Sequence, residues 1–200
     1  MSLESLKLKI HIDFKKLQNL YNELLNTLFP IVENKPELER LIIEEVTELN
    51  EFETLVFDFL DLNITIPIEE SFDRMRDLRI LAFDRLINVT GIAETQINTR
   101  QINGNQSIKN NFNKEIIKAN KIMYKIIKLL CIYSFDVLSA LVLLIPSTQT
   151  ELEEILQEQV DFLNQNIQEF EIIGLFKFAN KLIRFRDKFI IKFRNFFGLN

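Results

Sequence analysis

The sequence predicts a mainly α-helical protein, a bundle of about five helices. Apolar residues recur at steps of three and four along most of the chain, the spacing of one buried face of an α-helix. The 200 residues include only four Gly and four Pro, which leaves little material for the many tight turns of a β protein. Hydrophobic residues make up 47% of the chain, enough for a core without disulfides or metal. A few long helices are therefore expected.

The N-terminal segment fits two structures. Residues 6–14 alternate strictly between apolar and polar side chains, which is the periodicity of a strand. Residues 62–66 alternate in the same way and could pair with them, so a short two-stranded β element is one interpretation. The other is a helix, because the same N-terminal segment carries a helical stripe made of Leu3, Leu6, Ile10, Phe14 and Leu17.

Three helices are expected in the acidic N-terminal region, residues 1–92. The second has a clear start, since Asn34 can cap it and Glu37 follows three residues later. Residues 1–100 hold 19 acids and 11 bases, whereas residues 101–200 hold 10 acids and 13 bases, so the two halves should attract. The expected helices cover residues 13–29, 34–60 and 68–89.

An Asn-rich polar stretch, residues 93–113, separates the two halves. It has no apolar period and is interpreted as a loop or linker, the best boundary between residues 1–92 and 114–200. Limited proteolysis is expected to cut there first.

The C-terminal region, residues 114–200, is predicted to be a helical hairpin. Residues 129–145 carry one charge, Asp136, which falls on the lysine side of the helical wheel and fits a polar seam. Pro146 ends this helix, and Thr148 opens the next one with a capping box. The last helix is then very long or kinked at Gly174.

The last part of the chain, residues 175–197, reads as a basic amphipathic helix. It holds seven Phe and seven basic residues against one acid, Asp187. Such a helix can cover a core, bind an acidic protein or lie on an anionic membrane surface. The basic side chains expected to bind a partner lie away from the Phe stripe: Lys177, Lys181, Arg184, Lys188 and Lys192.

Composition excludes several classes of protein. Cys131 is the one cysteine and His11 the one histidine, so neither a disulfide framework nor a His-based metal cluster or triad can form within one chain. No cofactor is expected. A pI of about 5.1 without a reading motif argues against nucleic acid as a partner. The N-terminus shows no signal-peptide pattern, so the expected location is the cytoplasm.

Two sets of charged residues are candidate sites. Glu45 and Arg79 each interrupt an apolar stripe, which predicts a buried ion pair between neighbouring helices. The acidic pattern from Glu44 to Glu48, followed by Glu70 and Asp73, resembles the Mg²⁺-binding pattern of the all-helical nucleoside triphosphate pyrophosphohydrolases. However, Glu70 and Asp73 fall opposite the apolar stripe, which indicates an exposed acidic face.

These observations favour a non-enzymatic protein–protein interaction or adaptor module. Its partner is expected to be a protein, and a second copy of the chain is one candidate. The first alternative is a membrane-associating bundle, pore-forming or peripheral, that uses residues 129–145 and 175–197. Residues 129–145 are shorter than a usual span and carry an acid, so a central buried helix is the preferred interpretation. The second alternative is a Mg²⁺-dependent pyrophosphohydrolase.

Overall fold

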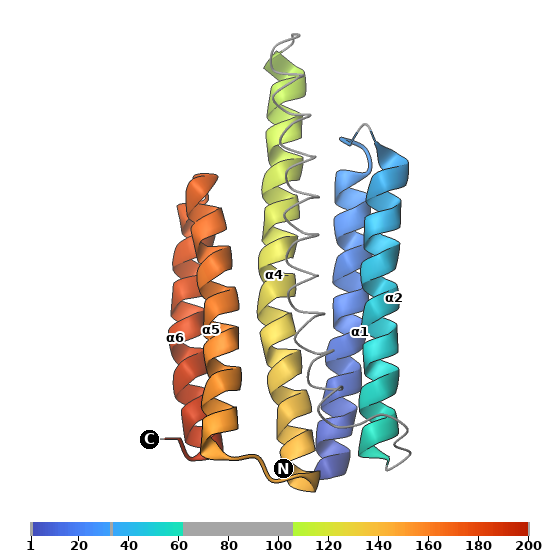
Figure 1. Ribbon diagram of the computed structural model, residues 1–200. Coiled ribbons are helices and arrows are strands. Elements are labelled where there is room, and N and C mark those ends of the chain that lie inside the picture. Colours follow the sequence, from blue (N-terminus) through green and yellow to red (C-terminus); the bar gives the residue numbers. More distant parts are fainter. Residues whose placement is uncertain (1, 33, 62–105, 200) are drawn as a thin grey trace. The chain divides into compact units, whose positions relative to one another are not determined.

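The protein is an all-α helical bundle. The computed structural model describes residues 2–32, 34–61 and 106–199, and all regular structure in these ranges is helical (Figure 1). This confirms the predicted fold class, while the expected strand at 62–66, the expected helix at 68–89 and Arg79 lie outside the described residues. The helices are α1 (Leu3–Leu28), α2 (Lys35–Leu60), α4 (Gln106–Leu144), α5 (Gln149–Ile172) and α6 (Phe176–Phe197).

The N-terminal segment is helical, so the interpretation of residues 6–14 as a strand is wrong. Helix α1 begins at Leu3, well before the predicted start at Asp13. Leu6 and Ile10 are at most 2% exposed, whereas Leu8 is 62% exposed. The period of 3.6 residues therefore decides which apolar side chains are buried, and the alternating residues Leu8 and Ile12 project into solvent.

The chain forms two compact units that divide within α1 and α4. We call His11–Ile126 the N-terminal unit, and Met1–Ile10 together with Ile127–Asn200 the C-terminal unit. Helix α4 begins at Gln106, so the end of the polar stretch 93–113 is helical, and the rest of it lies outside the described residues. A domain boundary in that stretch stays a prediction.

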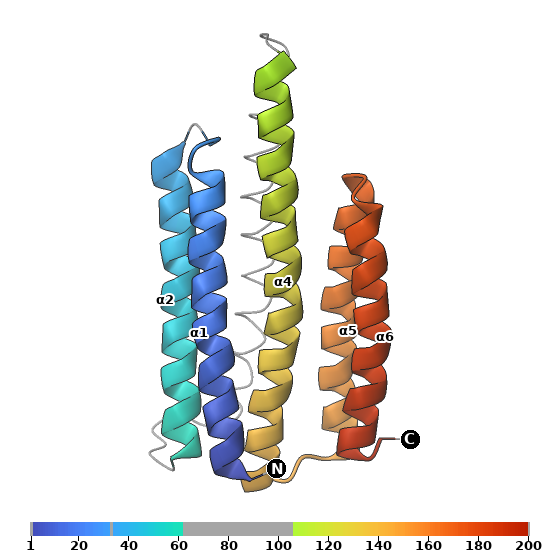
Figure 2. The same ribbon diagram turned by 180° about the vertical axis from the view of Figure 1, so that it is seen from behind.

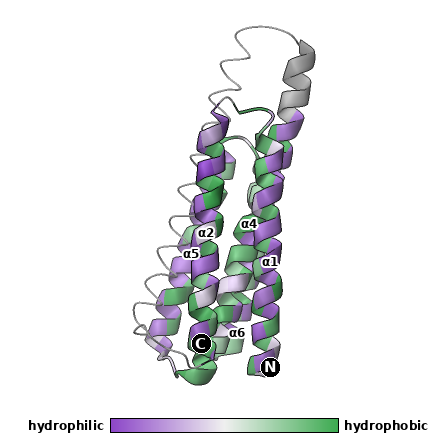
Figure 3. Cartoon of the chain, turned by 90° about the vertical axis from the view of Figure 1, so that its right-hand side faces the viewer, coloured by the Kyte–Doolittle hydropathy of each residue, from purple (hydrophilic) through white to green (hydrophobic). Residues whose placement is uncertain are grey.

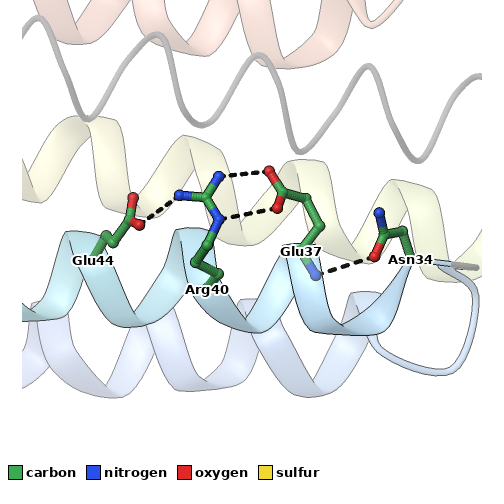
Figure 4. Close-up of polar contacts among 4 residues, drawn as sticks. All are labelled: Asn34, Glu37, Arg40 and Glu44. Carbon is green, nitrogen blue, oxygen red and sulfur yellow. Dashed lines mark hydrogen bonds and ion pairs between the residues drawn. The ribbon is translucent and has the colours of Figure 1, made fainter.

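In the N-terminal unit, α1 and α2 lie side by side and antiparallel (Figures 1 and 2). Polar contacts join them along the edge of their apolar faces: His11 Nδ1 lies 3.0 Å from Glu53 Oε1, and the Gln18 amide donates to Asn50 over 2.8 Å. The start of α2 is as predicted, because the Asn34 side chain accepts from the Glu37 N–H at 3.2 Å (Figure 4).

In the C-terminal unit, the second part of α4 is enclosed on most sides. Phe135 is 4% exposed, and its ring centroid lies 5.2–6.1 Å from those of four Phe residues of α6. The lone thiol of Cys131 is 1% exposed and lies in the core. Each helix alternates hydrophobic and hydrophilic residues around its circumference (Figure 3). The Phe residues against Phe135 are Phe189, Phe193, Phe196 and Phe197.

The predicted long or kinked last helix is two helices, which corrects the sequence interpretation. Gly174 has φ +77°, a left-handed conformation that ends α5. The Gly174 N–H donates to the Glu171 carbonyl at 3.0 Å, and the Leu175 N–H donates to the Phe170 carbonyl at 2.7 Å, the two bonds of a Schellman motif. Helix α6 then runs back along α5 as the second arm of a hairpin (Figures 1 and 2).

Candidate interaction surface on α6

Five basic side chains form a line along the solvent side of α6. They follow one another at steps of four, three, four and four residues, which keeps them within an arc of about 80° on a helix that turns about 100° per residue. All five are exposed. We call this set the basic row: Lys177, Lys181, Arg184, Lys188 and Lys192.

The basic row makes almost no polar contacts with the described residues. Lys177, Lys181, Arg184 and Lys188 have no hydrogen bond or ion pair with any residue in the described parts of the chain. Lys192 is the exception, because its Nζ lies 4.4 Å from the centroid of the Phe135 ring in a cation–π contact. The row therefore holds positive charge that no described residue neutralises through an ion pair.

The other two basic residues of α6 serve the packing of the hairpin. Arg186 donates to the Asn164 side chain at 2.7 Å, and Arg194 donates to Glu153 at 2.9 Å. Both of these partners belong to α5. The five residues predicted from sequence are thus the ones that face solvent, and the two that the prediction left out are the ones that face α5.

Exposed apolar side chains border the basic row. Ile191 is 60% exposed and follows Lys188 by three residues, while Phe176 and Phe196 are 61% and 49% exposed near the two ends of α6. Cationic side chains interleaved with exposed apolar ones are typical of surfaces that bind another macromolecule.

Helix α5 carries the opposite charge, a feature that the sequence prediction missed. It has seven acidic residues and no basic one, whereas α6 has seven basic residues and one acid. The sequence does contain a signal of this charge, because a run of 24 residues lacks Lys and Arg. Four of its acids fall on one side of the helix at steps of three, four and three residues. We call them the acidic row: Glu151, Glu154, Glu158 and Asp161.

The structure describes only some of the residues predicted to form a metal site or an ion pair. Glu45 is 5% exposed, as predicted, but Arg79 lies outside the described residues, so their pairing stays a prediction. Glu44 receives a hydrogen bond from Arg40, which also holds the pKa of the Glu37 carboxyl below its ordinary value (Figure 4). Within residues 2–32, 34–61 and 106–199, no three His, Cys, Asp or Glu side chains gather as metal ligands.

One helix among the described residues is long and apolar enough to cross a membrane. It is the part of α4 from Lys114 to Leu144, which includes all but the last residue of the candidate segment 129–145, and 72% of its most apolar stretch is buried inside the protein. A central helix of a soluble bundle has the same composition. Comparison with protein-family models, with curated proteins and with solved structures finds no match in any of the three.

Proposed function

We propose that this protein is a non-enzymatic protein–protein interaction module that binds an acidic protein surface through the basic row of α6. One observation carries the proposal: five cationic side chains share one exposed side of a helix, and four of them make no polar contact with the described residues. Such a surface attracts an acidic partner, speeds association and gives it a strong dependence on salt.

The packing of α6 favours a protein partner over a membrane. A helix that lies on a bilayer buries its apolar face among the lipids. The apolar face of α6 is already used, because Leu182 and Phe193 are 0% exposed and Phe189 is 4% exposed. Membrane insertion would therefore require α6 to leave its own unit, whereas an acidic protein can bind the basic row without any rearrangement.

The test uses a charge reversal that leaves this apolar face intact. The variant K181E/R184E/K188E should keep the circular dichroism spectrum and melting temperature of the natural chain, since all three side chains are exposed. A fluorescein-labelled oligoglutamate peptide is the probe. The natural chain should bind it at 50 mM NaCl and release it at 0.5 M NaCl, because salt screens exposed charges. The variant should bind at least about tenfold more weakly.

A second triple reversal controls for net charge. Lys114, Lys118 and Lys121 are exposed on α4, so K114E/K118E/K121E changes the charge equally at another surface. It should bind the peptide as well as the natural chain does. Equal binding by both variants would contradict the proposal. Flotation with phosphatidylserine vesicles that fails only in the α6 variant, without peptide binding, would support the membrane alternative instead.

A further inference from the structure

We propose that the acidic surface bound by the basic row is the acidic row of α5 on a second copy of the chain. This inference rests on the proposed function, since it names the partner of the same surface. It starts from a separation of charge within one hairpin. Helix α5 holds seven acids without a base, and α6 holds seven bases with one acid.

The two rows do not face each other within one hairpin. The side of α6 that contacts α5 is marked by Arg186, and at about 100° per residue the basic row lies roughly 160° away from it. The side of α5 that contacts α6 is marked by Glu153 and Asn164, and the centre of the acidic row lies about 110° away by the same count, with Asp161 at its nearer edge. The centre of each row therefore points away from the partner helix.

The rows match in spacing, and the acidic row is the shorter of the two. Both repeat at three and four residues, so each stays on one side of its helix. With a rise of about 1.5 Å per residue, the acidic row spans about 15 Å and the basic row about 22 Å, so four acids can lie along the basic row of another copy. Ile191 adds exposed apolar surface beside the charges. Glu151, Glu154 and Asp161 are exposed and Glu158 is half-buried.

This contact joins two different surfaces, so it is heterologous. A dimer formed in this way leaves one basic row and one acidic row unoccupied, and further copies can bind until a ring closes or the chain of copies ends. Light scattering at 50 mM NaCl should therefore show a mean mass that rises with protein concentration beyond that of a dimer. At 0.5 M NaCl the protein should be monomeric.

Charge reversal with complementation tests the pairing. The basic-row variant K181E/R184E/K188E and the acidic-row variant E154K/E158K/D161K should each be monomeric at 50 mM NaCl, because each carries like charges on both rows. An equimolar mixture should associate again. In that mixture the unchanged acidic row of the first variant meets the unchanged basic row of the second, and the two reversed rows complement each other. The dissociation constant of each variant alone should rise at least about tenfold.

A third variant controls for net charge. Glu39, Glu51 and Asp58 are exposed on α2, and E39K/E51K/D58K should associate as the natural chain does. A natural chain that stays monomeric at low salt but binds oligoglutamate would overturn this inference and leave the proposed function standing. A chain that binds neither itself nor the peptide would overturn both. Two folded variants whose mixture stays monomeric would overturn the pairing of these rows.

Discussion

Lys9 Nζ lies 2.7 Å from Asp136 Oδ1, an ion pair between residues 127 positions apart. It joins the first turns of α1 to α4 within the C-terminal unit. The Asp136 side chain is 1% exposed and that of Lys9 is 38% exposed, so a buried carboxylate meets a partly solvated ammonium. The sequence predicted a polar seam at Asp136, and α1 supplies the cation of that seam.

Lys9→Met should destabilise the protein by about 2 kcal/mol, because it removes the cation that faces a buried carboxylate. The solvation of Lys9 keeps this loss below that of a fully buried pair. The double variant K9M/D136L should recover most of the loss, since it removes both charges. Urea denaturation of the three proteins measures this. A double variant less stable than K9M would show that Asp136 stabilises the fold through its other contacts.

Gln159→Leu should stabilise the protein by about 1 kcal/mol. Gln159 is 1% exposed, and neither of its amide atoms has a hydrogen-bond partner among the described residues. Burial of such an amide costs free energy that an apolar side chain of similar size avoids. The matched change Gln165→Leu, at an exposed position of the same helix, should alter stability by less than about 0.5 kcal/mol. A destabilised Q159L would contradict this account.

Gly174→Ala should destabilise the α5–α6 hairpin by about 1 kcal/mol. A Cβ at Gly174 would meet nothing within 4 Å, so the cost comes from the left-handed backbone, φ +77°, and not from a clash. Asn tolerates this conformation better than Ala, so Gly174→Asn should lie between the two. Thermal melts rank the three proteins. Equal melting temperatures for Ala and Gly would mean that the turn changes its conformation without cost.

Stability should depend on pH through Glu53. Burial raises the pKa of the Glu53 carboxyl above its ordinary value of 4.5, and the hydrogen bond with His11 opposes part of that rise. The folded state therefore holds this proton more tightly than the unfolded state, and the free energy of unfolding falls as pH increases from about 4.5 through the folded-state pKa. Glu53→Gln should remove this part of the slope.

His11→Ala gives the same account a second test. It deletes the hydrogen bond that favours the ionised carboxylate, so the pKa of Glu53 should rise further. The carboxyl ¹³C chemical shift of Glu53, followed by NMR across the titration, reports that pKa directly. An unchanged or lower value in the variant would contradict the role given to His11.

Periodicity predicted the helices but not their ends. The apolar stripe through Leu6 and Ile10 identified one face of α1, yet the alternation through Leu8 matched a strand equally well, and burial by other helices decided between the two. The sequence also indicates a possible kink at Gly174. Whether a glycine kinks a helix or reverses the chain depends on the φ angle that it adopts. The spacing of residues along the sequence does not determine that angle.

The exposure of the basic row could be predicted from the sequence, whereas the charge pattern of the neighbouring helix was not. Spacing alone separated the basic row from Arg186 and Arg194, because solvent and packing select different sides of one helix. The acidic row was missed because the charge count compared halves of the chain, and the sharper contrast is between adjacent helices α5 and α6. The partners of Arg194 and Lys9 depend on distant segments, which no local pattern identifies.

The split of the C-terminal unit over two stretches of chain sets an order of events during synthesis. Lys9 is translated 127 residues before Asp136, a delay of about 6 to 25 s at typical elongation rates. The hairpin of α5 and α6, whose contacts are closer in sequence, can form as soon as both helices emerge. The ion pair of Lys9 with Asp136 can therefore form only after all of α2 has been translated, later than the contacts of α1 with α2.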